Sequence, residues 1–214
     1  MLGNGVSTGF TSVPAPVPGL PGITQVSTSG SHTLALTAIG TGFVWAWGNN
    51  IDGELGDGGT ASRSVPEELK LTGVTQVSAG GANSAAVRSN GTLLTWGNND
   101  FGQLGNGTSG TAVNAVPEVV PGLIGISQVA NAGDYNLAVV RAATVPSVIG
   151  KTTAAASTTL QAAGLVLGTI TDVTDNTCNY IGKVMRQNPV AGSVVVAGSA
   201  VAVTVGVRPP TPCP

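Results

Sequence analysis

His32 is the only histidine in the chain, and imidazole is the side chain that most readily changes charge near neutral pH. Such a group could act as a general base or as a metal ligand. The alternative is an ordinary strand residue, because His32 begins the segment His-Thr-Leu-Ala-Leu. The residues that take the same position in the internal repeats, described below, favour this structural alternative.

Four acidic residues lie in the two segments that follow Trp-Gly-Asn-Asn, namely Asp52, Glu54, Asp57 and Asp100. Loop carboxylates and carbonyls are the ligands that Ca²⁺ takes. The same residues also cap turns, because their side chains accept hydrogen bonds from nearby backbone amides. We favour turn capping and expect neither a metal ion nor another cofactor.

No combination of residues marks a catalytic centre. The sequence contains no Ser-His-Asp set, phosphate-binding loop, dinucleotide fingerprint or paired-carboxylate motif. The two cysteines, Cys178 and Cys213, have neither the CxxC spacing nor the histidine partner of a metal site. We therefore expect a protein that is not an enzyme.

Charge and hydropathy argue against two classes of partner. Only 8% of the residues are charged, the formal net charge is −2, and there is no basic cluster. Nucleic-acid binding is disfavoured because phosphates must be neutralised by Lys and Arg. No apolar run is long enough to span a membrane. The short Val- and Ala-rich runs between turn residues are typical of many short strands.

Four motifs recur in the same order at a period of about 51 residues. Leu-Gly-x-Gly begins at residues 2, 55 and 104, and Gln-Val begins at 25, 76 and 128. The segment at 32–36 recurs at 83–87 and 135–139, and that at 44–50 recurs at 93–99. These motifs predict antiparallel strands in units 2–54, 55–103 and 104–143, the last incomplete.

The repeats assign roles to single residues. Asn83 and Tyr135 take the position of His32, so that position does not require an imidazole. Trp47 and Trp96 also share one position, and we expect both to fill the space between neighbouring units.

Glycines mark the strand ends and turns. Gly30, Gly81 and Gly133 precede equivalent strands, where we expect a glycine to let two backbones approach closely. Asn90-Gly91 lies between two apolar runs and predicts a type I′ hairpin, in which both residues have positive φ.

These motifs resemble the regulator-of-chromosome-condensation repeat over roughly residues 2–143. The matching residues include 53–56 and 102–105, each ending in Leu-Gly. That family forms a seven-bladed propeller of about 50 residues per blade, whereas this sequence holds fewer than three complete units. We expect a mainly β fold with an open propeller of about three blades and exposed edges. Such a chain is either a fragment of a longer product, which we favour, or self-assembles through those edges.

A second module begins near Val145. Thr152 and Gly164 have the residue types that begin and end a helix. Strands are expected at 166–173, 183–187 and 200–205, the last with strictly alternating valines. Residues 144–207 therefore predict one helix on a three-stranded sheet, followed by a Pro-rich tail at 208–214.

The second module resembles the PASTA domain, a module of penicillin-binding proteins and bacterial serine/threonine kinases. The resemblance rests on VPxVxGKT from Val145, LxxAGL from Leu160, GKVxxQNPxAG from Gly182 and VxxGSxVxVxV from Val195. It implies a bacterial protein outside the cytoplasm, in the cell wall, at the surface or secreted. It also implies peptidoglycan or another envelope protein as partner, although many single copies show no clear ligand affinity.

Two further expectations rest on this resemblance. Lys183 and Arg186 could contact a muropeptide carboxylate, although an ordinary solvated strand face is the favoured alternative. Cys178 and Cys213 could form a disulfide in an oxidising compartment and hold the tail against the module. The alternative is two free thiols.

We interpret the chain as a non-catalytic cell-envelope or secreted binding or scaffold protein. Its propeller loops would contact protein or glycan, and its PASTA module would contact peptidoglycan or act as a spacer. One alternative is a regulatory protein with guanine-nucleotide-exchange activity, which the repeat family's founding member has. Another is an appendage of an enzyme whose catalytic domain lies upstream. Residues 1–5 lack the features of a secretory signal, so we expect a mature start or an upstream one.

Overall fold

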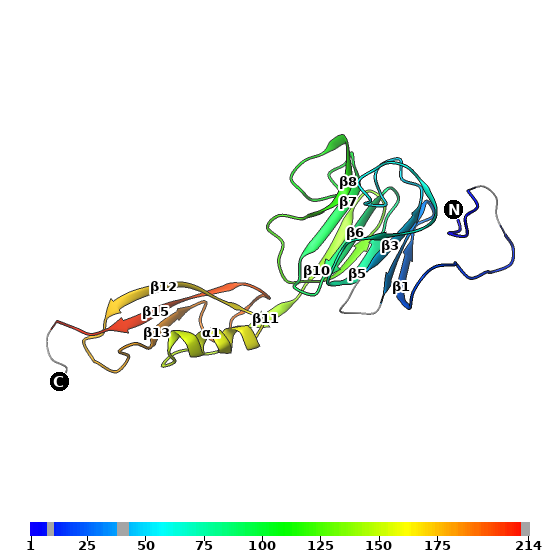
Figure 1. Ribbon diagram of the computed structural model, residues 1–214. Helices are drawn as coiled ribbons and strands as arrows, with labels where there is room; N and C mark the ends of the chain where they lie inside the picture. Colours follow the sequence, from blue (N-terminus) through cyan, green and yellow to red (C-terminus); the bar gives the residue numbers. More distant parts are fainter. Residues whose placement is uncertain (8–10, 38–42, 211–214) are drawn as a thin grey trace. The chain divides into compact units, whose positions relative to one another are not determined.

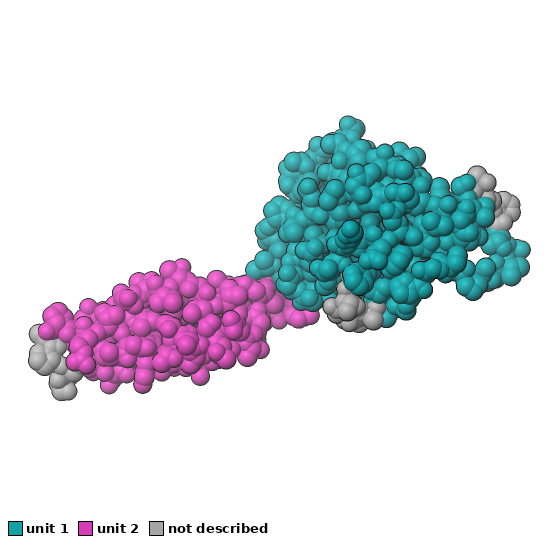
Figure 2. All heavy atoms as spheres, viewed as in Figure 1, with its two compact units in different colours: residues 1–139 teal, residues 140–214 magenta. Residues whose placement is uncertain are grey.

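The computed structural model of the chain describes residues 1–7, 11–37 and 43–210. Two compact units, Met1–Val139 and Val140–Pro214, are coloured teal and magenta in Figure 2. The described elements are fifteen strands and one helix, α1 (Figure 1). The expected mainly β fold with one small α+β module is therefore confirmed.

The first unit contains two four-stranded antiparallel sheets, called here the first and second blades. The first comprises β1 (Ile23–Thr28), β2 (His32–Thr37), β3 (Val44–Gly48) and β4 (Arg63–Leu69). The second comprises β5 (Val74–Ala79), β6 (Asn83–Arg88), β7 (Leu93–Asn99) and β8 (Gly110–Val119). Strands that are consecutive in sequence pair in both sheets, so each blade is a simple meander.

The third blade has two strands among the described residues, β9 (Ile126–Asn131) and β10 (Asn136–Val140). No ring closes within the described part of the chain, so the open partial propeller is confirmed. The Leu-Gly-x-Gly segments at 55–58 and 104–107 lie in the connections before β4 and β8. The sequence units 2–54, 55–103 and 104–143 are therefore offset from the structural blades.

The turn at Asn90-Gly91 is not the type I′ hairpin that the sequence predicts. Gly91 has φ +80°, but Cys178 is the only described non-glycine residue with positive φ. The Gly91 amide donates to the Arg88 carbonyl, and the Arg88 amide donates to the Thr92 carbonyl, both at 2.9 Å. The connection is thus a three-residue loop that ends on a left-handed glycine.

Hydrophobic cores lie between the blades. One cluster joins residues of β2 and β3 to residues of β5, β6 and β7, including Leu34, Leu36, Val74, Val77 and Trp96. A second joins the second blade to the third, including Ala85, Val87, Ile126 and Val129. Because each blade is a single sheet, its apolar face is buried only by its neighbour.

The second unit packs α1 (Thr153–Ala162) on a three-stranded sheet, as expected. The strand order is β12 (Val166–Thr174), β15 (Ala200–Val207), β13 (Val184–Asn188). Ala156 and Leu160 of the helix are buried with Val201, Val203 and Val205 of the central strand. The alternation of that strand thus places one complete row of valines against the helix.

The helix begins and ends at the residues that the sequence indicates. The Thr152 side chain accepts the amide of Ala155 at 3.3 Å, which satisfies one unpaired donor of the first turn. Gly164 follows the last turn with φ +73°, a conformation that glycine adopts without strain.

A further two-stranded sheet, unexpected from the sequence, pairs β11 (Ala142–Thr144) with β14 (Val194–Val196). This pairing ties the start of the second unit to its own interior. The unit consequently begins at Val140, whereas the sequence places the division after residue 143. Within the described residues, no helix has the length and hydropathy needed to cross a bilayer.

Candidate binding surfaces

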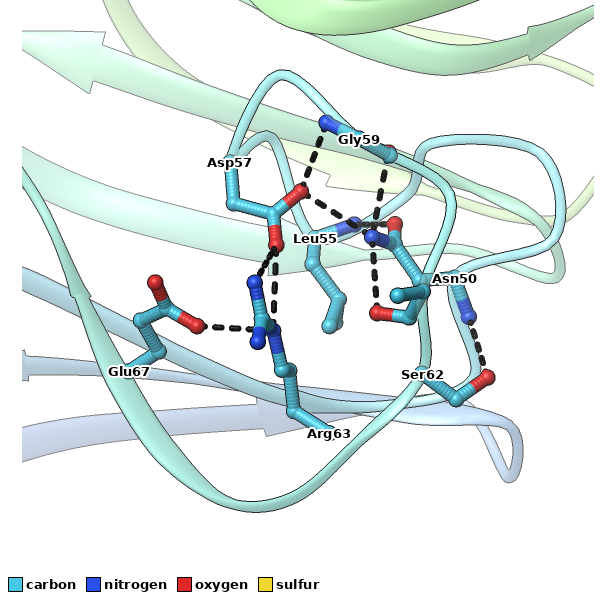
Figure 3. A network of polar contacts seen from close by, with 8 residues as sticks. Asn50, Leu55, Asp57, Gly59, Ser62, Arg63 and Glu67 are labelled. Atoms are coloured by element: carbon cyan, nitrogen blue, oxygen red, sulfur yellow. Dashed lines mark hydrogen bonds and ion pairs between the residues drawn. The ribbon is translucent and has the colours of Figure 1, made fainter.

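The loop after β3 is held by the side chain of Asn50, which is fully buried (Figure 3). Its amide nitrogen lies 3.0 Å from Oδ1 of Asp57 and 3.1 and 3.2 Å from the carbonyls of Gly59 and Ala61. Its oxygen accepts the Leu55 amide at 2.9 Å. One side chain thus satisfies both ends of the loop that carries Leu-Gly-x-Gly.

Asp57 completes this network through its second oxygen. Arg63 donates to Oδ2 from Nη2 at 2.9 Å and also pairs with Glu67 at 2.7 Å (Figure 3). Partial burial raises the pKa of Asp57, but hydrogen bonds from the Gly59 amide and from Arg63 outweigh this effect and lower the pKa below its ordinary value. The carboxylate is therefore engaged within its own loop.

The second blade builds the same loop without the charge. Asn99 accepts the Leu104 amide at 3.0 Å and donates to the Thr108 carbonyl at 3.0 Å. Asn106 replaces Asp57 and lies 3.2 Å from the Asn99 amide nitrogen. Across the described residues, no group of three or more His, Cys, Asp or Glu side chains is arranged to hold a metal ion.

Glu54 is fully buried in the first of these loops. Its carboxylate accepts the Asp52 amide at 2.9 Å and the Asn49 side chain at 2.5 Å. Burial raises the pKa of Glu54 above its ordinary value, although these hydrogen bonds oppose the shift. Gln103 takes the equivalent position and accepts the Phe101 amide at 3.0 Å, so a neutral amide serves the same purpose in the second blade.

The other two acidic residues meet at Asn98. Its amide nitrogen donates to Asp52 of the first-blade loop at 3.3 Å and to Asp100 of its own loop at 3.1 Å. The arrangement links successive blades through hydrogen bonds. All four acidic residues of the sequence motif thus bind protein donors.

His32 lies between the first two blades and is 2% exposed. Its Nε2 is 2.8 Å from the Ser84 hydroxyl, and its Nδ1 is 3.3 Å from the Ser31 hydroxyl. Burial lowers the pKa of His32 to about 4. The neutral ring acts as a hydrogen-bonded spacer between blades, and the Ser84 hydroxyl donates a hydrogen bond to the main-chain carbonyl of Glu54 at 2.7 Å.

Trp47 and Trp96 take equivalent places against Leu-Gly-x-Gly segments. Trp96 donates from Nε1 to the Glu54 carbonyl at 2.9 Å, and a Cβ on Gly56 would lie 2.7 Å from the same nitrogen. On the first blade, a Cβ on Gly3 would lie 2.8 Å from Nε1 of Trp47. Both indoles therefore pack against the main chain of a Leu-Gly-x-Gly segment.

The glycines at the starts of β2, β6 and β10 do not share one role. Gly30 and Gly133 have φ of +101° and +84°, with open space where a Cβ would stand. Gly81 lacks a positive φ, and its Cβ would be 3.4 Å from Cα of Gly133. Backbone conformation explains the first two glycines, and the distance at Gly81 is an ordinary van der Waals contact, so none of the three shows the expected close approach of two backbones.

Glutamines make a repeated clamp between blades, whose role the sequence motif did not reveal. Gln25 donates to the Val77 carbonyl at 3.1 Å and accepts the Val77 amide at 3.0 Å. Gln76 does the same to Val129 at 3.0 and 2.8 Å. The signal in the sequence was a glutamine that recurs before valine at one position of the repeat.

The sheet of the second unit has a polar face opposite α1. Arg186 of β13 lies opposite Thr204 of β15, which lies opposite Thr171 of β12. Thr204 alternates with the valines that face the helix, so this row is on the other side of the sheet. Arg186, Thr171 and nearby Lys183 are exposed.

Comparison with protein families decides the nature of both units. Residues 23–54 and 74–103, and also 41–87 and 90–139, match models of the regulator of chromosome condensation (RCC1) repeat. The chain belongs to the RCC1-repeat family. Residues 143–207 match the PASTA domain. The RCC1 repeats thus cover 23–139, and a PASTA domain follows them.

Two curated relatives resemble part of this chain. The chain is similar to the RCC1 domain-containing protein RUG3, mitochondrial, of Arabidopsis thaliana, with 38% identity over 97 residues. The ultraviolet-B receptor UVR8 of the same plant is 36% identical over 97 residues. Each match covers 43% of this chain and 21% of the relative, so the chain spans about a fifth of these proteins.

A solved structure supports the fold of the repeats. A chain in the crystal structure of Kap60 bound to yeast RCC1 (Prp20) aligns with a TM-score of 0.52 and 19% identity. The alignment covers 64% of this chain and 35% of that one.

The predicted disulfide would join the PASTA domain to a residue outside the described part of the chain. Cys178 lies in the loop that follows β12, but Cys213 lies in the undescribed segment 211–214, so the disulfide stays a prediction. Asp175 orders this loop by accepting the Thr177 hydroxyl and the Tyr180 amide, each at 2.6 Å. The hydrogen bond from the Thr177 side chain is the main cause that lowers the pKa of Asp175.

Proposed function

We propose that this chain is a non-catalytic binding protein of the bacterial cell envelope or the secreted fraction, and that its PASTA domain binds peptidoglycan. The RCC1 repeats act as a scaffold that presents loops to protein or glycan. The observation that carries the proposal is the polar row formed by Arg186, Thr204 and Thr171 on the uncovered face of a PASTA domain.

The chemistry of this row suits a muropeptide. A guanidinium can bind a carboxylate of the peptide stem through two parallel hydrogen bonds, and threonine hydroxyls can donate to or accept from sugar hydroxyls. Both ion pairs in the described part of the chain involve Arg63, so Lys183 and Arg186 have no acidic partner there.

The side chains best suited to act as a general acid or base are buried in structural contacts, which supports a non-catalytic role. His32 is neutral and buried between blades, and Glu54 is buried in its loop. A general base must reach the proton it removes, and neither group faces a surface that a substrate could touch.

Sedimentation with purified peptidoglycan tests the proposal. We expect the wild-type chain to be retained and K183A/R186A to lose at least about tenfold in affinity, the usual effect of removing charged hydrogen bonds. The control is K70A/R208A, which removes the same charge from exposed positions outside the row. Equal retention of the two double variants, or no retention of the wild type, would contradict the proposal.

A further inference from the structure

The third blade exposes a face that is buried on both other blades. Tyr135, Leu137 and Val139 of the third repeat are 57%, 63% and 53% exposed. Their equivalents in the first blade are His32, Leu34 and Leu36, none more than 2% exposed. In the second blade they are Asn83, Ala85 and Val87, none more than 1% exposed. Together with Gln128 and Ala130, the three exposed residues are called the third-blade face.

The first blade exposes the complementary side of the same junction. Val26 is 59% exposed, whereas its equivalents Val77 and Val129 are 1% and 3% exposed because a preceding blade covers them. Val26 and its strand neighbours Ile23 and Thr28 are called the first-blade face. In the second and third blades, the side equivalent to the first-blade face packs against the preceding blade. It contacts the face that carries Leu34 and Leu36 in the first blade and Ala85 and Val87 in the second.

The polar contacts of the junction are also left open at both faces. Gln25 and Gln76 clamp the main chains of Val77 and Val129, but Gln128 makes no side-chain hydrogen bond to any described residue. The main chain of Val26 is equivalent to those of Val77 and Val129, but no glutamine side chain binds it among the described residues. One chain therefore carries both the Gln128 side-chain amide and the Val26 main chain that such an amide would bind.

We propose that the third-blade face binds the first-blade face of a second copy of this chain, so that copies associate head to tail. The occupant follows from continuity, because the chain already builds this junction twice between its own blades. Leu137 and Val139 would pack where Leu34 and Leu36 pack, and Gln128 would clamp the partner's Val26. Because the two faces differ, the contact is heterologous and one copy can bind two others.

One contact of the internal junctions is absent from the proposed one. Ser27 accepts the Ala79 amide at 2.9 Å, and Ser78 accepts the Asn131 amide at 2.9 Å. The third repeat has Ala130 at this position, which leaves the amide at the partner's Thr28 without an acceptor. A serine at position 130 would supply it.

Sedimentation velocity of the full chain over a range of concentrations tests the association. We expect the average mass to rise with concentration, and L137D and V26D each to weaken self-association at least tenfold. V190D is the matched control, because Val190 is 65% exposed and lies in the PASTA domain. All three positions are exposed, so circular dichroism should show the wild-type fold. A wild type that stays monomeric at every concentration overturns the proposal.

Mixing the two blocked variants separates this arrangement from a symmetric dimer. V26D keeps an intact third-blade face, and L137D keeps an intact first-blade face, so their mixture should form a dimer that neither forms alone. A symmetric contact between two third-blade faces would instead leave V26D dimeric and give no new species on mixing. That result overturns the proposal, whereas a mixed dimer supports it.

The variant A130S gives a test by gain. One added hydrogen bond at the junction should tighten association about threefold to tenfold. The exposed substitution A132S, outside the junction contacts, is its control and should leave association unchanged. If A130S weakens association or leaves it unchanged, Ala130 does not face Thr28 of a second copy and the register is wrong.

Discussion

Trp96 of the second blade donates its indole N–H to the main-chain carbonyl of Glu54 in the first blade at 2.9 Å. The same carbonyl accepts the Ser84 hydroxyl at 2.7 Å, so two donors of the second blade meet one acceptor of the first. Gly56 lies against the indole ring, and this contact fixes how closely the loop approaches.

Gly56→Ala should destabilise this junction more than Gly58→Ala. Both glycines have positive φ, +78° and +84°, so an alanine meets the same backbone strain at either position. Only at Gly56 would the added Cβ overlap Trp96, at 2.7 Å, because Gly58 has open space. We expect the free energies of unfolding to differ by about 1–3 kcal/mol, the usual cost of overpacking. Equal losses in urea denaturation would show that the loop retreats from the indole freely.

His32 should make the protein less stable in acid. Burial lowers its pKa from 6.5 to about 4, so between these values the unfolded chain binds a proton that the folded chain does not. This contribution is fully present above pH 6.5 and falls by about 3 kcal/mol as the pH decreases to 4. His32→Asn, which copies Asn83, should abolish that part of the pH dependence. If the free energies of unfolding of the two proteins change with pH in the same way between pH 7 and pH 4, the assignment is contradicted.

Glu54→Gln should stabilise the protein near neutral pH. Burial raises the pKa of Glu54, so its contribution to stability is largest in acid and is lost as the pH rises through the folded value. A glutamine keeps an acceptor for the Asp52 amide, and its NH2 can donate to the Asn49 side-chain oxygen once that amide turns over, as Gln103 donates to Asn98, so the buried charge is removed. We expect a gain of about 1 kcal/mol at pH 7 that shrinks towards pH 4, measured by chemical denaturation. A gain independent of pH would mean that charge is not the cause.

Asn50→Ala should cost about 2 kcal/mol in the free energy of unfolding, because backbone groups of the loop lose the hydrogen bonds that the Asn50 side chain supplies. The control is Asn90→Ala at an exposed turn, where Asn90 accepts the Thr92 amide at 3.0 Å. That change should cost less, since water can replace the lost bond. Similar losses for the two variants would indicate that the loop is solvated after the Asn50 substitution.

The sequence by itself determined the two architectures, because each depends on local patterns that repeat. The period of the motifs predicts successive blades, and the alternating valines from Val201 to Val205 predict one buried face under a helix capped by Thr152. The prediction of a type I′ turn at Asn90-Gly91 was wrong, because the turn type depends on the register of the two strands that flank it.

Only the tertiary structure decided how the blades join. The bonds from Gln25 to Val77 and from Trp96 to Glu54 connect residues in different repeats, and no local pattern indicates which neighbour a side chain will reach. For the same reason the sequence could list Leu137 among the apolar strand residues but could not show that it is exposed. Burial is a property of two surfaces brought together, whereas a strand pattern describes one of them.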